Sequence, residues 1–316
     1  MISRDKLKQD VNVSSAELID FLKQEKLYIQ DNGVEQTTNN VSALENSNQT
    51  SLSWIDYENY NLKKLDSSIL IVSKEFKEKS SQKSIIYTSN PILAIVQVLN
   101  QFFMEIHTGG YIADSASIDQ SAKIGKNCII NENVVIAQNV VLGDNVTLYP
   151  DVVLYPNTIV KDNVIINSGT KIGQEGYGYI KDAKGQYIQF PHIGKVILEK
   201  GVEIGANTCI DRGALSDTVI GENTKIDNFC HISHNCRIGK NCLMAGKAGM
   251  AGSTIVEDNV FLGPRSSLMN GITIGANSII TAVSLIRKSV KPNTTMVPFE
   301  ALEQREYIKT IKKMRA

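Results

Sequence analysis

Large aliphatic residues recur at every sixth position over most of the chain. One unbroken run of eleven such residues covers 112–172, a short run covers 198–210, and after a slip of four residues a third run covers 220–286. An α-helix would need apolar spacings of three and four, and a coiled coil a spacing of seven. The six-residue period instead predicts short extended segments joined by tight turns, each with one large side chain in a shared core.

The residue two positions before each aliphatic is almost always small or β-branched. In an extended segment the two positions face the same way, so a bulky and a compact side chain both point inward, as a narrow triangular prism requires. Pairs such as Asp144-Asn145 fill the corners, where a positive φ is tolerated. Four cysteines occupy the compact inward position and are expected to pack there: Cys128, Cys230, Cys236 and Cys242.

This pattern resembles the hexapeptide-repeat signature of the left-handed β-helix family. The resemblance implies a mainly β protein with a left-handed parallel β-helix over 107–290, 18 residues per coil and assembly into a homotrimer. Residues 174–192 interrupt the coils, and because an insertion cannot enter a filled prism, we expect it to project over a face or a neighbouring subunit. The alternative, a strand-rich sandwich with coincidental spacing, does not account for an unbroken period of six.

The remaining segments lack the period. Residues 1–106 contain two apolar runs typical of strands, 69–73 and 84–89, and two helical patterns, one after Ser14 or Ser15 and one over 91–103. We therefore predict a small N-terminal α/β domain. Residues 291–316 predict a C-terminal helix. Its basic side chains suit either an acidic carrier or a solvated surface.

Charge and composition restrict the class of protein. Lys+Arg and Asp+Glu both number 33, so no global field favours nucleic acid or an acidic membrane surface. No apolar run is long enough for a transmembrane segment, and the first residues lack the apolar region of a signal peptide. Five cysteines without a CxxC pair suit a reducing compartment. We expect a cytoplasmic protein without a metal or a cofactor.

Three residues at a spacing of 18 form one candidate column, in which we expect His234 and Gly252 to be catalytic and Asn270, like Asn235, to bind substrate. His234 follows the inward Ile232 and lies near the end of its segment, and Gly252 and Asn270 follow one and two coils later. Amide formation from a thioester needs a base for the attacking amine and a donor for the oxyanion, which an imidazole and a glycine N–H supply. On spacing alone, the alternative is a surface histidine bonded to a neighbouring loop.

The segment 172–253 resembles the LpxD family of lipid A N-acyltransferases, most specifically in IDRGAL and ISHNC. The resemblance implies that His234 is the general base, that Gly252 supplies the oxyanion amide, and that Asn235 follows the base as in the family. SLSWIDYENY and SNPILAIVQV resemble the uridine-binding domain of the family, with Trp54 and Tyr60 at the positions that stack on the base and Tyr57 in place of an asparagine. Core packing is the alternative for these aromatic residues.

Two departures separate the chain from the family. The second histidine of the family is missing, since no histidine follows His234, and the glycine-proline element before the carrier-docking helix is replaced by MVPFEALEQREY. The resemblance therefore implies an N-acyltransferase that uses acyl-CoA or an acyl carrier protein as co-substrate and a nucleotide-linked amino sugar as acceptor, for surface polysaccharide. The alternative is LpxD proper, acting in lipid A synthesis on UDP-3-O-(3-hydroxyacyl)glucosamine.

A zinc hydratase of the γ-carbonic anhydrase type is an alternative from another class. Such a site needs three histidine ligands at suitable spacing. The four histidines are His107, His192, His231 and His234. Only the last two lie close together along the repeat, which disfavours this function.

Overall fold

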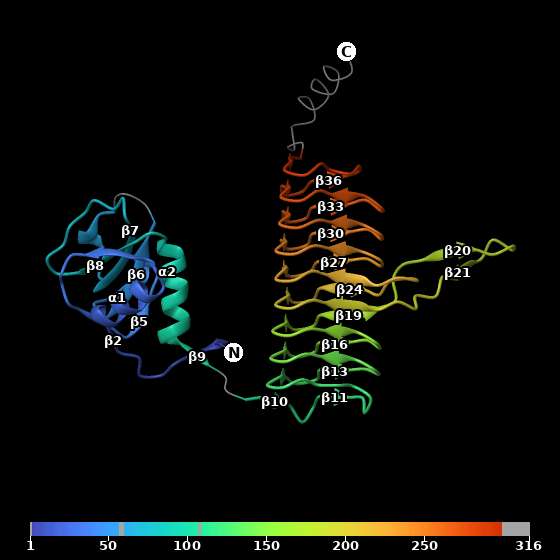
Figure 1. Ribbon diagram of the computed structural model, residues 1–316, viewed down its shortest axis with the longest axis horizontal. Helices are drawn as coiled ribbons and strands as arrows, with labels where there is room; N and C mark the ends of the chain where they lie inside the picture. The colour runs from blue at the N-terminus through green and yellow to red at the C-terminus, as the bar shows by residue number, and fades with distance from the viewer. Residues whose placement is uncertain (1, 57–59, 107–108, 299–316) are drawn as a thin grey trace, which may run out of the picture. The chain divides into compact units, whose positions relative to one another are not determined.

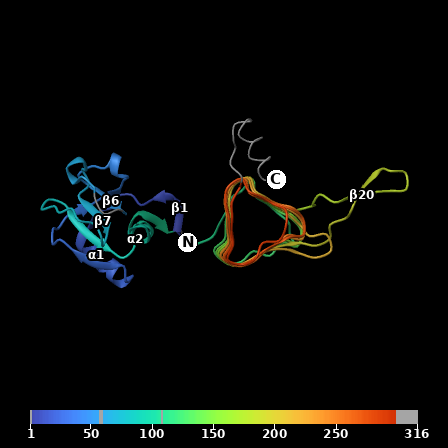
Figure 2. The same ribbon diagram turned by 90° about the horizontal axis from the view of Figure 1, so that it is seen from above.

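The structure is a computed structural model and describes residues 2–56, 60–106 and 109–298. It divides into two compact units, residues 1–108 and 109–316, which Figure 1 draws in blue to green and in green to red. Most of the second unit is a stack of coils with a triangular outline (Figure 2). The mainly β fold predicted from the six-residue period, a left-handed parallel β-helix, is thus confirmed. The predicted helix over 291–316 lies largely outside the described residues.

The coils contribute strands to three parallel sheets, one on each face of the prism. The first face contains β10 (Tyr111–Ile112), β12 (Ile129–Ile130), β15 (Thr147–Leu148), β18 (Ile165–Ile166), β23 (Glu203–Ile204), β26 (Lys225–Ile226), β29 (Leu243–Met244), β32 (Phe261–Leu262), β35 (Ile279–Ile280) and β37 (Thr295–Met296). The second contains β11 (Ser117–Ile118), β13 (Val135–Ile136), β16 (Val153–Leu154), β19 (Lys171–Gln174), β24 (Cys209–Asp211), β27 (His231–Ile232), β30 (Gly249–Met250), β33 (Ser267–Leu268) and β36 (Leu285–Ile286). The third contains β14 (Val141–Leu142), β17 (Ile159–Val160), β22 (Val196–Leu198), β25 (Thr218–Ile220), β28 (Arg237–Ile238), β31 (Ile255–Val256) and β34 (Thr273–Ile274). Because β37 continues the stack, the coils extend past residue 290, where the sequence predicts their end.

The interior of the prism is filled by the two inward positions that the period predicts. Ile232 and the preceding Cys230 are both buried, as are their counterparts in the neighbouring coils. Asparagine occupies many corners with a φ near +60°, for example +58° at Asn145. Such a corner is inexpensive for asparagine because its short polar side chain tolerates the left-handed region. Each coil thus repeats the same local rule and stacks in register on the one before.

The insertion between β19 and β22 leaves the prism, as expected. Its middle forms an antiparallel hairpin of β20 (Tyr179–Lys181) and β21 (Tyr187–Gln189), which projects outward in both views (Figures 1 and 2). The chain then returns to the third face at β22. The insertion therefore leaves and rejoins the coil without breaking the pairing of the strands on either side.

The first unit is the α/β arrangement that the sequence predicts. Its central sheet has the order β3 (Tyr28–Asp31), β8 (Ser84–Thr88), β7 (Ile69–Ser73), β6 (Ser51–Ile55) and β5 (Asn40–Val41). Two further pairs are β1 (Ile2–Leu7) with β9 (Met104–Ile106), and β2 (Val13–Ser14) with β4 (Thr37–Thr38). The helices are α1 (Ser15–Gln24) and α2 (Pro91–Val98), with a π-helical turn at Leu99–Phe103 and 3₁₀ turns at Leu44–Asn46 and Leu62–Lys64.

Helix α1 begins where the sequence indicates. Ser14 is its N-cap, and its hydroxyl accepts from the Glu17 N–H while the Glu17 carboxylate accepts from the Ser14 N–H, which completes a capping box. Pro91 opens α2, as its fixed φ favours. In neither unit does the described chain contain a helix with the length and apolarity required to cross a bilayer.

Candidate functional site

The candidate site lies along the edge where the second face turns into the third. His234 is in the corner between β27 and β28, Gly252 in the corner between β30 and β31, and Asn270 in the corner between β33 and β34. The coils are joined there by hydrogen bonds from the Ser253 N–H to the His234 carbonyl, at 2.9 Å, and from the Gly271 N–H to the Gly252 carbonyl, at 3.1 Å. The structure therefore brings the three residues into one column, as the spacing of 18 predicts.

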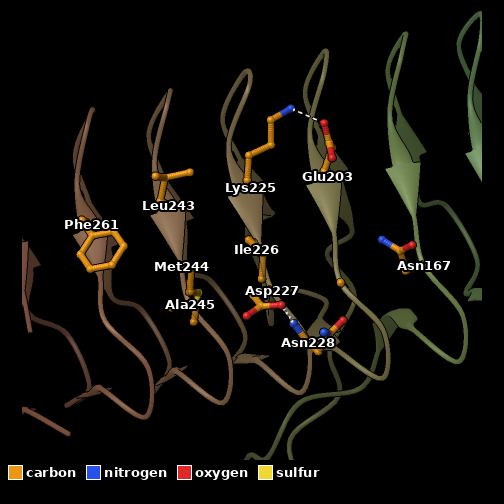
Figure 3. Close-up of a pocket in the computed structure, with 11 residues that line it drawn as sticks. Asn167, Glu203, Lys225, Ile226, Asp227, Asn228, Leu243, Met244, Ala245 and Phe261 are labelled. Atoms are coloured by element: carbon orange, nitrogen blue, oxygen red, sulfur yellow. Dashed lines mark hydrogen bonds and ion pairs between the residues drawn. The ribbon is translucent and has the colours of Figure 1, made fainter. Parts of the chain in front are cut away.

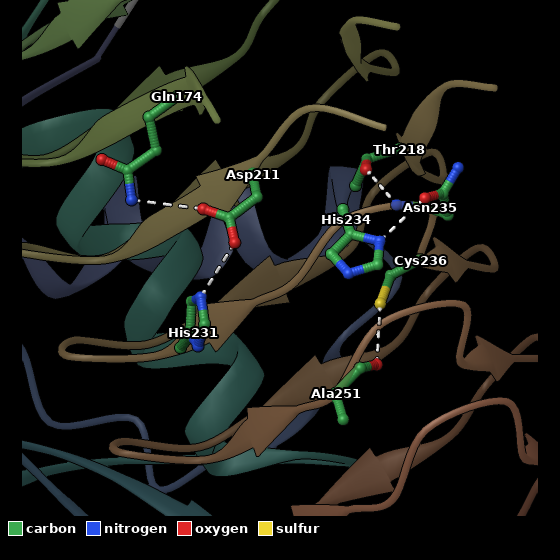
Figure 4. A network of polar contacts seen from close by, with 8 residues as sticks. All are labelled: Gln174, Asp211, Thr218, His231, His234, Asn235, Cys236 and Ala251. Atoms are coloured by element: carbon green, nitrogen blue, oxygen red, sulfur yellow. Dashed lines mark hydrogen bonds and ion pairs between the residues drawn. The ribbon is translucent and has the colours of Figure 1, made fainter. Parts of the chain in front are cut away.

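The side chain of Asn235 determines which nitrogen of His234 carries the proton. The Oδ1 atom of Asn235 lies 3.1 Å from the Ala214 backbone nitrogen, which can only donate, so this atom is an oxygen. The Nδ1 atom of His234 lies 2.8 Å from the same oxygen (Figure 4). Because an amide oxygen only accepts, Nδ1 of a neutral His234 carries the hydrogen and Nε2 keeps its lone pair. Nε2 is therefore the basic atom of the ring.

The loop that interrupts the repeat before β25 holds Asn235 in place. The Asn235 amide group donates to the Ser216 hydroxyl at 2.8 Å, and its backbone N–H donates to the Thr218 hydroxyl at 2.9 Å. Its backbone has a φ of +62°, which asparagine adopts at small cost. The slip of four residues between Ile210 and Ile220 thus has a structural use, since it supplies the partners that orient the residue after the base.

Gly252 leaves room for the ring of His234. A Cβ atom on this glycine would stand 2.6 Å from Cε1 and 2.8 Å from Nε2 of His234. Side-chain carbons do not approach ring atoms this closely without displacing them. The basic nitrogen therefore lies directly against the Gly252 backbone, one coil away.

The N–H of Gly252 points away from the interior of the prism. The carbonyl of the same peptide, that of Ala251, accepts from the buried Thr254 hydroxyl at 2.7 Å. It also accepts from the buried Cys236 thiol at 3.3 Å (Figure 4). Burial raises the pKa of Cys236 to about 12, so the thiol keeps the proton that it donates. In a trans peptide the N–H is opposite the C=O. The Gly252 N–H is therefore directed out of the prism, and no acceptor for it occurs within the described ranges.

Asn270 stabilises the next peptide of the same corner. Its side-chain amide donates to the Gly252 carbonyl at 2.6 Å. The Gly252 peptide is thus held from both sides, by Thr254 and Cys236 before it and by Asn270 after it. Asn270 is exposed and contacts the glycine rather than the imidazole, so the structure gives it a supporting position in the column.

A second polar pair lies on the second face. Asp211 on β24 is buried, and its carboxylate lies 3.1 Å from Nε2 of His231 on β27 and accepts from the Gln174 amide at 3.2 Å (Figure 4). The hydrogen bond to Asp211 raises the pKa of His231, while desolvation opposes the shift. The pair thus favours the protonated form of His231.

The structure also places a histidine that the sequence does not single out. His192, at the end of the insertion, lies with its ring centroid 5.0 Å from that of His234. The six-residue period cannot reveal this contact, because the insertion is outside the repeat and returns to the coil after the hairpin. The one local hint in the sequence is the pair of glycines in the insertion. Gly176 passes close to the rings of His192 and His234, and Gly178 passes close to the ring of His192.

Trp54 and Tyr60 of the first unit pack against different hydrophobic clusters. Trp54 packs against the cluster that contains Ile69 and Ile71, and Tyr60 packs against the cluster that contains Leu70 and Val72. Alternate residues of β7 face opposite sides of the sheet. The two rings therefore belong to opposite sides, and Tyr57 lies outside the described residues. The nucleotide-binding role of Trp54, Tyr57 and Tyr60 stays a prediction.

The first face has a separate hollow of about 360 Å³, away from the His234 corner. An ion pair of 2.8 Å joins Lys225 and Glu203 at its edge, and Leu243 and Phe261 continue its lining (Figure 3). It contains none of the predicted site residues. Among the residues that the structure describes, no group of three or more His, Cys, Asp and Glu side chains is arranged to hold a metal ion.

Comparisons with protein families match the repeat region. A family model described as bacterial transferase hexapeptide (six repeats) matches residues 139–174 and 217–252, and one described as hexapeptide repeat of succinyl-transferase matches residues 253–282. The matched segments include His234, Gly252 and Asn270. The hexapeptide signature predicted from the period is thus confirmed.

Curated relatives extend the similarity to a particular group of enzymes. The chain is 44% identical over 147 residues to UDP-3-O-acylglucosamine N-acyltransferase 2 of Rhodopseudomonas palustris, which is 46% of this chain and 39% of the relative. It is 38% identical over 143 residues to the UDP-3-O-acylglucosamine N-acyltransferase of a Caulobacter species, 45% of this chain and 42% of the relative. The chain matches about two fifths of the length of these relatives.

Solved structures share the architecture. The UDP-N-acetylglucosamine acyltransferase of Francisella novicida superposes with a TM-score of 0.55 at 25% identity, covering 64% of this chain and 73% of that one. The protein of the same name from Campylobacter jejuni superposes with a TM-score of 0.53 at 19% identity, covering 65% of this chain and 83% of that one. The second comparison concerns the fold alone.

Proposed function

Because the chain is an LpxD-like hexapeptide-repeat protein, we propose that it transfers an acyl group from a thioester to the amino group of a nucleotide-linked amino sugar. One observation carries the proposal. The Asn235 side chain keeps the proton of His234 on Nδ1, so a basic Nε2 lies against a glycine whose N–H is directed out of the prism.

The chemistry follows from these two groups. The sugar amine attacks the thioester carbonyl, and His234 Nε2 accepts the proton that the nitrogen loses as the C–N bond forms. The Gly252 N–H stabilises the oxyanion of the tetrahedral intermediate. When the C–S bond breaks, protonated His234 returns the proton to the leaving thiolate. No covalent enzyme intermediate is required, since the thioester is already activated.

The relatives support a UDP-3-O-acylglucosamine as the acceptor. Over 147 and 143 residues the chain is similar to two proteins that are named UDP-3-O-acylglucosamine N-acyltransferases. They favour the lipid A alternative of the sequence interpretation over the broader surface-polysaccharide function. The proposed acceptor therefore carries one acyl chain and a free 2-amino group.

A panel of substrate pairs tests the proposal. Purified protein is incubated with UDP-3-O-acylglucosamine, UDP-glucosamine or a dTDP-linked amino sugar, each with an acyl-CoA or an acyl carrier protein, and products are identified by mass spectrometry. We expect an N-acylated product from the UDP-3-O-acyl sugar and none above background with His234→Ala. Equal turnover by that variant, or no turnover of any pair by the wild type, would overturn the proposal.

Three further parts of the proposal concern partners. We propose a homotrimer, an acyl carrier protein or acyl-CoA as donor, and binding of the nucleotide by the first unit through Trp54. Size-exclusion chromatography with light scattering tests the homotrimer, and the substrate panel tests the identity of the acyl donor. For the third, Trp54→Ala is expected to raise KM for the sugar nucleotide more than it lowers kcat. An unchanged KM would assign Trp54 to core packing instead.

A further inference from the structure

His192 lies beside the proposed base although it belongs to the insertion. It follows Phe190 at the end of the hairpin and is 4% exposed. Its ring meets that of His234 in an edge-to-face arrangement, with an interplanar angle of 72° and centroids 5.0 Å apart. The ring of Phe190 also contacts the His192 ring edge to face, with centroids 6.3 Å apart and an interplanar angle of 90°. A second imidazole is therefore packed against His234 in a largely water-free position.

The proton of a neutral His192 is on Nδ1. This nitrogen lies 2.8 Å from the Phe190 carbonyl oxygen, which only accepts, so Nδ1 donates and Nε2 has a free lone pair. The Nε2 atom is buried, and no hydrogen-bond partner for it exists in the described chain. Leaving a buried acceptor unpaired costs stability. Such a group in a native protein calls for an explanation.

The backbone of the insertion covers both rings. A Cβ atom on Gly176 would stand 3.1 Å from Nε2 of His192 and 2.9 Å from Cδ2 of His234. A Cβ atom on Gly178 would stand 2.9 Å from Cε1 of His192. The lone pair of His192 and the Cδ2 edge of His234 thus border the same small space. Gly176 lies on the Cδ2 edge of His234 and Gly252 on its Nε2 edge.

We propose that His192 is a positioning residue for His234, an inference that rests on the proposed function. In the proposed reaction His234 becomes positively charged in a partly buried site. The free lone pair of His192 is the negative end of a neutral ring and stabilises this charge without offering a proton of its own. The ring of His192 also packs against the ring of His234 and keeps the Nε2 atom of His234 against Gly252. The absence of a donor to His192 Nε2 is then part of its role.

Three substitutions at one position separate the lone pair from the packing. His192→Phe keeps a flat ring and removes both nitrogens. In His192→Gln the amide oxygen reaches the place of Nε2, whereas in His192→Asn the shorter amide reaches only the place of Nδ1. We expect kcat to fall roughly tenfold in His192→Phe and His192→Asn, with KM for both substrates changed less than about twofold, and His192→Gln to recover most of kcat.

The measurements distinguish this inference from the proposed function. Thermal unfolding of each variant shows whether it is folded. If His192→Phe does not fold, the comparison of His192→Gln with His192→Asn tests the inference. Wild-type kcat in both His192→Phe and His192→Asn, or equal losses in Gln and Asn, would overturn the role of His192 while the active wild type and inactive His234→Ala still support acyl transfer. An inactive wild type would instead overturn the proposed function itself.

Discussion

The ring of His234 occupies the space in which a side chain at position 252 would stand. A Cβ atom on Gly252 would be 2.6 Å from Cε1 and 2.8 Å from Nε2 of that ring. Because of this close contact, even the added methyl group of Gly252→Ala should disturb the ring of His234. The relationship joins the proposed base and the proposed oxyanion donor in a single contact between neighbouring coils.

Gly252→Ala is expected to lower kcat by about 100-fold or more, because the methyl group displaces the imidazole and crowds the N–H that we propose stabilises the oxyanion. The melting temperature should change little, since the half-buried ring can turn toward solvent. Gly249→Ala is the matched control. It lies on the adjacent β30, where a Cβ atom would have ordinary contact with the His231 carbonyl at 3.9 Å. Steady-state kinetics of both variants check the prediction, and similar kcat values would contradict it.

Asn235→Gly tests the orientation of the base without straining the corner. Glycine adopts the φ of +62° freely, but the ring of His234 loses the oxygen that holds its Nδ1–H. We expect kcat to fall by about 10- to 100-fold as the ring populates the wrong tautomer and rotamers. Asn277→Gly, at a corner with a φ of +57°, should keep wild-type kcat. An equal effect of the two substitutions would remove the special role of Asn235.

Thr254→Val tests the direction of the Gly252 N–H. Thr254 and Thr158 are both fully buried, and each donates at 2.7 Å to the carbonyl three residues before it, but only Thr254 holds the peptide that contains the Gly252 N–H. Both valine variants should lose on the order of 1 kcal/mol of unfolding free energy. Only Thr254→Val should also lower kcat. A normal kcat in a folded Thr254→Val protein would show that the peptide keeps its direction by other means.

The His231–Asp211 ion pair predicts a dependence of stability on pH. The hydrogen bond to Asp211 raises the pKa of His231 above its usual value of 6.5. The pair therefore contributes its full stability below about pH 6.5 and loses it as the pH rises through the raised pKa of the folded protein. The effect should be small, because the His231 side chain is 53% exposed and solvent screens the pair.

His231→Gln keeps a hydrogen-bond donor near Asp211 and removes the titration. The melting temperature of the wild type relative to this variant should decline as the pH rises above about 6.5 and through the raised pKa of His231. Differential scanning calorimetry of the two proteins gives this difference directly. A difference that is constant with pH, or that grows as the pH rises, would mean that the pair does not titrate as described.

The repeat made most of the second unit predictable. A strict period of six specifies which residues point inward, and the spacing of 18 places His234, Gly252 and Asn270 in one column before any coordinates are known. The direction of the Gly252 N–H was beyond prediction, because it depends on the hydrogen-bonded position of Thr254 and Cys236. The contact of His192 with His234 arises in an insertion without a register. Trp54 and Tyr60 lie outside the repeat, where no periodic rule assigns a side chain to a partner.

The stacked coils also determine how the molecule should lose its structure. Each coil is hydrogen bonded only to the coils before and after it, so opening starts most easily at the ends of the stack and advances inward. The corner with His234 is followed by three more strands on the second face and preceded by five, so several coils shield it on either side. The hydrogen-bonded backbone amides of β27 and β30 should therefore exchange with deuterium among the slowest in the chain. Local opening of the terminal coils would therefore leave the proposed site intact.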